Sequence, residues 1–180
     1  MSDAERAQQG RPAAREQNSS APARPTPDAV ARVRAALEAA AVDVRIVEFA
    51  QSTRTAQDAA RALGTSVGQI VKSLVFLADR RPVLVLASGA NRVDTSKVAR
   101  LAGAVRVEKA SADATRDATG FSIGGVPPVG HRAALRVYID RTLLTFDLVY
   151  AAAGTAHAVF GIAPPALVRL TSGTVGDLAE

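Results

Sequence analysis

The sequence predicts an α+β fold, a mixed α/β domain in which a central mixed β-sheet is flanked by helices. Short runs rich in Val, Leu and Ile, bounded by turn residues, are typical of strands. Other segments carry apolar residues at helical spacing, begin at capping residues and end at glycine. Because the two kinds of segment alternate without a steady strand–helix–strand rhythm, α+β is favoured over a regular parallel α/β fold.

The composition fits one globular domain with some additional sequence. The chain has 180 residues, of which 48% are hydrophobic, and this is enough for a core. Aromatic residues make up 4%, so the core must be mainly aliphatic. The absence of cysteine excludes disulfides, thiolate zinc sites and a cysteine nucleophile, and two histidines are too few for a His-rich centre. We therefore expect no metal and no cofactor.

The charge of the chain favours a polyanionic partner. The formal net charge is +5 and the pI is near 10.4, although an arginine-rich composition alone gives the same balance. No run approaches 18 apolar residues and the N-terminus has no apolar signal core. No membrane association is expected, and a cytoplasmic location is the default expectation.

The chain divides into a tail and a folded region. Residues 1–26 consist mostly of Ala, Arg, Gln, Pro and Ser, and they cannot bury enough apolar surface to offset the entropy of ordering. We predict a disordered tail over 1–26 and a single domain over 27–180.

The folded region begins with a helix, a strand and a second helix. Thr26-Pro27 supplies an N-cap and a proline at the first helical position, and apolar residues follow at helical spacing. Residues 43–49 alternate in part and predict a strand. A sequence like a capping box starts the second helix at Thr55, and Gly64 ends it.

A hairpin with an unexpected lysine comes next. Residues 69–77 and 83–87 are predicted strands joined by the turn 79–82. Both faces of the first strand are mostly apolar, yet alternation places Lys72 beside Ile70, Leu74 and Phe76. A lysine there is costly unless its ammonium meets an anion, carbonyl oxygens or a wet cleft. A lysine that snorkels at the sheet end is the alternative.

The rest of the chain contains further short elements. Up to residue 120 the predictions are a helix from Asp94 to Gly103, a strand over 105–108 and a helix from Ser111 to Gly120. A half-exposed strand is predicted over 134–140, with Arg136 and Tyr138 on its solvated face. An apolar stretch over 143–153, a strand over 158–162 and a last helix over 166–170 after Pro164-Pro165 complete the domain.

One loop stands out by its composition. It reads Gly124-Gly125-Val126-Pro127-Pro128-Val129-Gly130-His131. Its glycines allow backbone angles closed to other residues, while its prolines fix φ and remove two N–H donors. A rigid surface connection is the plain interpretation of such a loop, and a wall of a functional site is the other.

Familiar catalytic motifs are missing from the sequence. There is no G-x-G-x-x-G after a strand, no P-loop and no G-x-S-x-G, and no carboxylate pair stands out. In an enzyme of this kind the nucleophile is water or a group on the substrate. The amides of Gly124, Gly125 and Val126 are candidates to polarise a carbonyl, and Lys72 to hold a phosphate or ribose oxygen.

From about Thr55 to Leu170 the chain resembles the YbaK/EbsC family, which shares a superfamily with the editing domain of bacterial prolyl-tRNA synthetases. The motifs that carry the resemblance occur in order. They are Thr55-Ala56 with Ala59-Ala60 and Leu63-Gly64, the run Ile70 to Phe76, Val93-Asp94 with Lys97-Val98-Ala99, the loop Gly124 to His131, and Tyr150 to Val159.

The resemblance implies a deacylase that hydrolyses the ester of mischarged aminoacyl-tRNA with help from the substrate's own groups. It implies Lys72 near the terminal adenosine and a G-x-x-x-P-x-x-H loop lining the amino-acid pocket. The candidate catalytic residues are Lys72, Gly124, Gly125 and His131. The candidate substrate-binding residues are Ser73, Val126, Pro127, Pro128, Gly154, Thr155 and His157.

The sequence departs from the cysteinyl-specific branch of that family. The Ser and Asp of the branch's Ser-Gly-Gly-Lys-Arg-Gly-Leu-Asp run are missing from residues 152–159, so cysteine specificity is not implied. The expected partners are aminoacyl-tRNA, held at its 3′-terminal adenosine and acceptor end, and an aminoacyl-tRNA synthetase. Two alternatives stay open: a binding module without hydrolysis, and a hydrolase of small esters.

Overall fold

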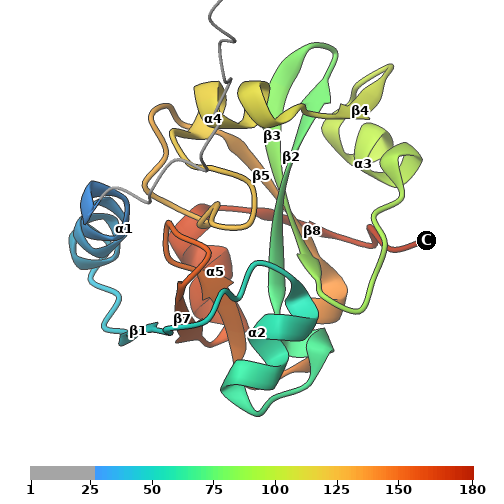
Figure 1. Ribbon diagram of the computed structural model, residues 1–180. Helices are drawn as coiled ribbons and strands as arrows, with labels where there is room; N and C mark the ends of the chain where they lie inside the picture. Colours follow the sequence, from blue (N-terminus) through green and yellow to red (C-terminus); the bar gives the residue numbers. More distant parts are fainter. Residues whose placement is uncertain (1–26) are drawn as a thin grey trace, which may run out of the picture.

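The computed structural model describes residues 27–180, and the tail predicted over residues 1–26 lies outside them. Two sheets form the framework (Figure 1). The larger has five strands in the order β4-β2-β3-β5-β8, and the smaller has three in the order β1-β7-β6. The mixed α/β class is confirmed, and the predicted central mixed sheet is joined by this second, antiparallel one.

The helices are α1 (Pro27–Ala39), α2 (Ala56–Leu63), α3 (Thr95–Ala102), α4 (Ala112–Thr119) and α5 (Pro164–Thr171), with 3₁₀ turns η1 (Val67–Gln69) and η2 (Arg141–Thr145). The strands are β1 (Ile46–Glu48), β2 (Val71–Ala78), β3 (Arg81–Ser88), β4 (Val107–Lys109), β5 (Arg136–Asp140), β6 (Val149–Ala152), β7 (Ala158–Ile162) and β8 (Thr174–Gly176).

Three helices begin at the capping residues that the sequence predicts. The side chains of Thr55, Asp94 and Ser111 each accept a hydrogen bond from a main-chain N–H in the first turn of α2, α3 and α4. Each of these helices ends at a glycine in the left-handed conformation. Local chemistry therefore fixes the lengths of these helices.

The large sheet is mixed because its two halves are connected differently. β2 and β3 form an antiparallel hairpin whose register runs from Val71↔Ser88 to Ala78↔Arg81. β3 pairs with β5 in parallel, and β5 pairs with β8 in parallel. A short bridge between Ile70 and Tyr150 brings the start of β2 beside β6 of the small sheet. The two sheets therefore meet at the beginning of β2.

Both faces of the large sheet are covered. One face packs against α3 and the C-terminal segment through a cluster that includes Phe76, Val85, Val98, Tyr138 and Leu178. The other packs against α1, α5 and the small sheet through a larger cluster that includes Val33, Val75, Leu86, Phe160 and Leu167. The prediction that β2 is covered on both sides is confirmed.

Some local predictions were wrong. Tyr138 is only 4% exposed, because α3 and the C-terminal segment cover the face of β5 expected to be solvated. The apolar stretch over 143–153 contains part of η2 and all of β6, and β8 follows the last predicted helix. His157 lies in the turn before β7, directly ahead of the predicted strand over 158–162.

Candidate active site

A cavity of about 440 Å³ opens where the two sheets meet. Its walls come from the segment before α2, from α2 itself, from the start of β2, from the glycine–proline loop and from β6 and β7. The lining residues are Thr53, Arg54, Thr55, Ala56, Gln57, Ala59, Ile70, Val71, Lys72, Ser73, Leu74, Gly89, Ile123, Gly124, Val126, Tyr150, Ala152 and Val159.

Lys72 and the glycine–proline loop line this same cavity. The half-buried Lys72 donates from Nζ to the main-chain carbonyl of Asn91, and this is the one hydrogen bond of its side chain within residues 27–180. An ammonium has three donors, so two are left for a ligand. Burial lowers the pKa of Lys72, while the nearby carboxylate of Asp140 raises it.

The main-chain amides of the glycine–proline loop differ in whether they are already hydrogen-bonded. Gly124 and Val126 both line it, and neither amide donates to an acceptor within residues 27–180. The amide of Gly125 differs, because it donates to the carbonyl of Ser122 over 3.0 Å and Gly125 lies outside the lining. Of the three amides considered from the sequence, two are therefore available.

Gly125 has a packing function in the loop. A Cβ atom at this position would lie 2.8 Å from the Cα and carbonyl carbon atoms of Thr155, closer than real side chains approach. Gly154 is packed in the same way, because its Cβ would lie 2.7 Å from the carbonyl oxygen of Ala29. Both glycines therefore allow two main-chain segments to pack in direct contact.

The His131 side chain supports the loop from outside the lining. Its Nε2 lies 2.7 Å from the carbonyl oxygen of Pro127, and its ring meets the edge of Phe121 at a centroid distance of 6.1 Å. Burial lowers the pKa of His131, the hydrogen bond to Pro127 raises it, and the charge of Arg32 lowers it. The geometry favours a loop-fixing role over direct contact with a ligand.

Helix α1 holds the loop on its other side. Arg32 donates to the carbonyl oxygen of Gly120 over 2.8 Å and stacks over Phe121 at 4.2 Å from the ring centroid. Gly130 packs against the main chain of Arg32, where a Cβ would lie 3.3 Å from the carbonyl oxygen. The glycine–proline loop is thus anchored by α1.

The remaining candidate residues lie around the cavity without all lining it. Ser73 lines it, and its buried hydroxyl has no hydrogen-bond partner within residues 27–180. Pro127 and Pro128 are buried and lie outside the lining. Thr155 and His157 belong to the turn between β6 and β7, where the amide of His157 donates to Thr155 Oγ1 over 3.2 Å.

Several cavity and near-cavity residues were missed by the sequence reasoning. Arg54 lies at the cavity with its side-chain stem across Gly124, since a Cβ there would be 2.5 Å from Arg54 Cγ. It forms no ion pair within residues 27–180. Asn91 and Asp140 stand behind Lys72. Arg54 stands beside a capping residue, and Asn91 and Asp140 meet only in the folded chain, so none of the three has a strong local signal in the sequence.

The lining is poor in groups that perform acid–base chemistry. Among the described residues it contains Lys72, Arg54 and several hydroxyls, but no Asp, Glu, His or Cys. Across residues 27–180, no cluster of three or more His, Cys, Asp or Glu side chains is arranged to hold a metal. The cavity can therefore bind an anion and a carbonyl oxygen, and within residues 27–180 its lining holds no carboxylate, imidazole or thiol for acid–base chemistry.

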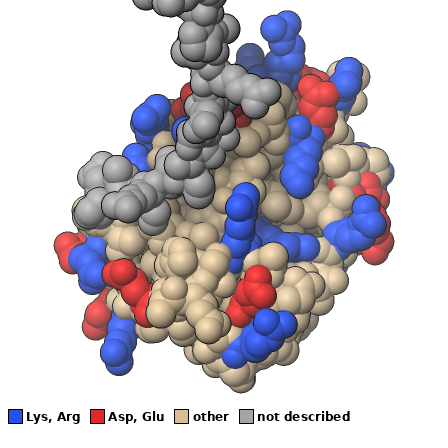
Figure 2. All heavy atoms as spheres, viewed as in Figure 1, with Lys and Arg blue, Asp and Glu red and all other residues tan. Residues whose placement is uncertain are grey.

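The surface around this region carries mixed charge. Figure 2 shows Lys and Arg side chains distributed between acidic ones, with some gathered near the middle of this face, where β2 passes in Figure 1.

Within the described part of the chain, no helix is both long and apolar enough to cross a membrane.

Comparison with protein families matches residues 50–170 to the aminoacyl-tRNA editing domain. Among curated proteins, YwhH of Bacillus subtilis, itself uncharacterised, is 31% identical over 123 residues, which is 68% of this chain and 78% of YwhH. EbsC of Enterococcus faecalis, a candidate Cys-tRNA(Pro)/Cys-tRNA(Cys) deacylase, is 28% identical over 134 residues, which is 73% of this chain and 82% of EbsC. A proline–tRNA ligase of Bacillus licheniformis is 37% identical over 89 residues, 49% of this chain and 16% of the ligase.

Solved structures show the same fold. A candidate trans-editing enzyme for prolyl-tRNA synthetase superposes with a TM-score of 0.80 at 46% identity, covering 84% of this chain and 97% of that one. The hypothetical protein APE2540 superposes with a TM-score of 0.78 at 32% identity, covering 83% of this chain and 99% of that one.

Proposed function

The chain belongs to the aminoacyl-tRNA editing domain family, and we propose that it acts in trans as a deacylase that hydrolyses the ester of mischarged aminoacyl-tRNA. The observation that carries the proposal is the pairing of two kinds of donor in one cavity. The Lys72 ammonium has donors to spare, and the amides of Gly124 and Val126 have no protein acceptor within residues 27–180.

These donors suit two parts of the substrate, the terminal nucleotide and the ester carbonyl. Lys72 holds a phosphate or ribose oxygen of the terminal nucleotide, and Arg54 at the same cavity contacts an adjoining phosphate. The amides of Gly124 and Val126 donate to the ester carbonyl oxygen and stabilise the negative charge that develops on it. His131, Gly125 and Thr155 hold the loop in place.

The reaction is a substrate-assisted hydrolysis. Water adds to the ester carbonyl carbon, and the bond between that carbon and the ribose oxygen then breaks. A proton from the water reaches the departing ribose oxygen through the vicinal hydroxyl of the terminal ribose, and the products are a free amino acid and uncharged tRNA. The lack of Asp, Glu, His and Cys in the lining supports this division of labour.

The cavity walls favour a small amino acid. They are formed largely by short aliphatic side chains, among them Ala56, Ala59, Val126, Ala152 and Val159. The similarity to a candidate trans-editing enzyme for prolyl-tRNA synthetase supports tRNA-Pro as the carrier. The proposal includes a cytoplasmic location, because charged tRNA is made and used in the cytoplasm. It also includes an aminoacyl-tRNA synthetase as a partner, because synthetases produce the charged tRNA.

A panel of charged tRNAs tests the function. We expect hydrolysis of tRNA-Pro carrying Ala, Cys or Ser, with rates above those in buffer. Lys72→Ala should lower kcat/KM by on the order of 10²-fold or more, because a charged donor to the bound substrate is lost. Lys109→Ala, which removes an exposed lysine on β4, is the matched control and should keep the wild-type rate.

Two outcomes would contradict the proposal. No hydrolysis of any charged tRNA, with binding retained, would assign the fold to a binding module. Equal turnover of small esters without tRNA, insensitive to Lys72→Ala, would assign it to a small-ester hydrolase.

A further inference from the structure

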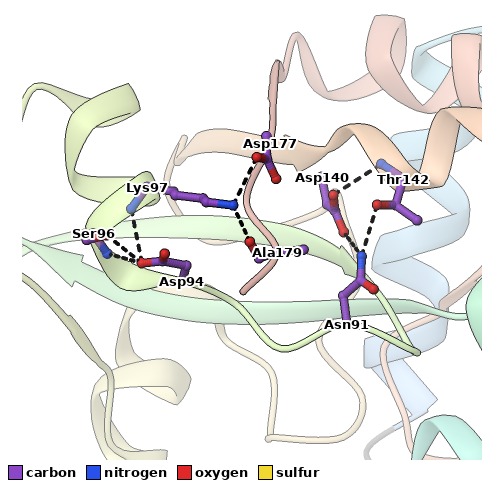
Figure 3. Close-up of polar contacts among 8 residues, drawn as sticks. All are labelled: Asn91, Asp94, Ser96, Lys97, Asp140, Thr142, Asp177 and Ala179. Carbon is purple, nitrogen blue, oxygen red and sulfur yellow. Dashed lines mark hydrogen bonds and ion pairs between the residues drawn. The ribbon is translucent and has the colours of Figure 1, made fainter.

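A hydrogen-bond network lies directly behind Lys72, outside the cavity lining. The side-chain amide of Asn91 donates from Nδ2 to Asp140 Oδ2 over 2.7 Å and to Thr142 Oγ1 over 2.9 Å. Figure 3 shows Asn91 and Thr142 converging on Asp140. The main-chain carbonyl of the same Asn91 accepts the Lys72 ammonium. Asn91 therefore connects Lys72 to a carboxylate.

The carboxylate of Asp140 is unusually enclosed. Asp140 ends β5 and is 1% exposed. It accepts the amide of Thr142 over 3.1 Å and that of Ser88 over 3.4 Å, and it forms no ion pair within residues 27–180. A buried carboxylate costs stability unless hydrogen bonds and nearby positive charge compensate. The hydrogen bonds are supplied by the network, and the nearby charge is that of Lys72.

We propose that Asn91 and Asp140 are positioning residues for Lys72. Asn91 fixes the place of the ammonium through its carbonyl oxygen. Asp140 holds Asn91 by its side chain and supplies the negative charge that favours the protonated lysine. The catalytic consequence rests on the proposed function, whereas the effect on Lys72 itself is a property of the free protein.

The protein also contains a plain lysine–aspartate tie for comparison. Lys97 of α3 donates to Asp177 Oδ2 over 2.9 Å and to the carbonyl oxygen of Ala179, which fastens the C-terminal segment to the helix (Figure 3). That contact is direct, and neither side chain lines the cavity. If Lys72 served only to hold two segments of the fold together, a direct ion pair like that of Lys97 with Asp177 would be enough.

The charges around Lys72 define the expected pH effect. Burial lowers its pKa most, Asp140 raises it, and Arg92 and Lys109 lower it. Asp140 is the group of opposite sign among these three. Removing its charge should therefore lower the pKa of Lys72 further, so that the ammonium loses its proton at a lower pH.

Lysine side-chain NMR measures this directly, because the chain contains only three lysines, at positions 72, 97 and 109. The ¹³Cε resonances are titrated in the wild type, in Asp140→Asn and in the matched control Asp177→Asn, with Lys72→Ala to assign the signal. We expect the Lys72 titration to move to lower pH in Asp140→Asn and to stay in place in Asp177→Asn. An unchanged Lys72 titration in Asp140→Asn would overturn the proposal. Should Asp140→Asn fail to fold, Asp140→Ser carries the same test.

Kinetics supply the second readout. The alkaline limb of the kcat/KM profile should shift to lower pH in Asp140→Asn, after subtraction of spontaneous ester hydrolysis. Asn91→Ala, which keeps the carbonyl but frees the loop, should lower kcat/KM about 10- to 100-fold, mainly through kcat. An unchanged kcat in Asn91→Ala would overturn the positioning role. A wild type without deacylase activity would remove the proposed function and leave the NMR result standing.

Discussion

Gly124 combines a backbone requirement with a contact to the cavity. Its φ is +90°, a region that side chains rarely adopt, and the stem of Arg54 crosses its α-carbon. A Cβ atom would lie 2.5 Å from Arg54 Cγ, so even alanine would displace the arginine. The residue therefore shapes the loop and places a cationic side chain.

Gly124→Ala should reduce both the stability of the protein and its deacylase activity. We expect a loss of about 1–2 kcal/mol in the free energy of unfolding from the left-handed backbone and a fall in kcat/KM of about tenfold or more. The matched control is Gly64→Ala, since Gly64 has φ +65° and nothing within 4 Å of its Cβ position. Urea unfolding and deacylation are measured on both variants. Equal activity in the two would contradict a role for Gly124 in the site.

At the residue scale, the sequence pointed to the parts of the site that break a pattern. Lys72 interrupts an apolar strand, and the glycine–proline loop has an unusual composition. Arg54, Asn91 and Asp140 neither interrupt an apolar strand nor belong to a stretch of unusual composition. Asn91 and Asp140 are 49 residues apart in sequence, so their contact arises only when β3 and β5 pair in parallel. Tertiary contacts of this kind have no local signal.

At the element scale, the β2–β3 hairpin depends on a tight turn without glycine. Asp79 and Arg80 both have positive φ, at 46° and 68°, and they connect strands paired from Ala78↔Arg81. Such two-residue turns favour glycine because a side chain is strained there. The carboxylate of Asp79 is used, since it accepts the amides of Val105 and Arg106. Arg80 donates no side-chain hydrogen bond within residues 27–180.

Arg80→Gly should therefore stabilise the protein. We expect a gain of about 0.5–1 kcal/mol in the free energy of unfolding, because the left-handed strain is relieved. Arg81→Gly is the matched control and should destabilise, since Arg81 is an extended residue of β3. Urea unfolding measures both. The same sign for the two variants would show that the turn strain is negligible.

Elements with strong local signals were predicted best. The capped helices α2, α3 and α4 begin at the predicted residues, whereas β1 is shorter than the predicted strand. β6 was missed because its sequence does not alternate between apolar and polar residues. Val149 and Ala151 are buried in the core, and the other two residues, Tyr150 and Ala152, border the cavity. β8 has three residues and exists through its pairing with β5. Both strands are specified by their partners.

At the scale of the whole molecule, charge should govern the proposed encounter with tRNA. The chain carries a formal net charge of +5, and Lys and Arg gather near the middle of the face in Figure 2. Contacts between cationic side chains and phosphates release counterions, so binding weakens as salt rises.

The salt dependence of deacylation tests this expectation. The logarithm of kcat/KM should fall linearly with the logarithm of salt concentration, by about 0.7–0.9 for each phosphate contacted. Arg54→Ala should reduce the magnitude of this slope by the amount expected for about one phosphate contact. Arg61→Ala, on the exposed face of α2, is the control and should leave the slope unchanged. A slope of zero for tRNA substrates would contradict an electrostatic contribution.

The anchoring of the glycine–proline loop by α1 matters when only part of this domain is transferred into another protein. The family match spans residues 50–170, whereas Arg32, which binds Gly120 and stacks on Phe121, lies upstream of it. Residues 50–170 thus carry the cavity but leave out part of its support. Any host protein that acquired this stretch alone, by gene fusion or by engineering, would have to provide its own brace for the loop.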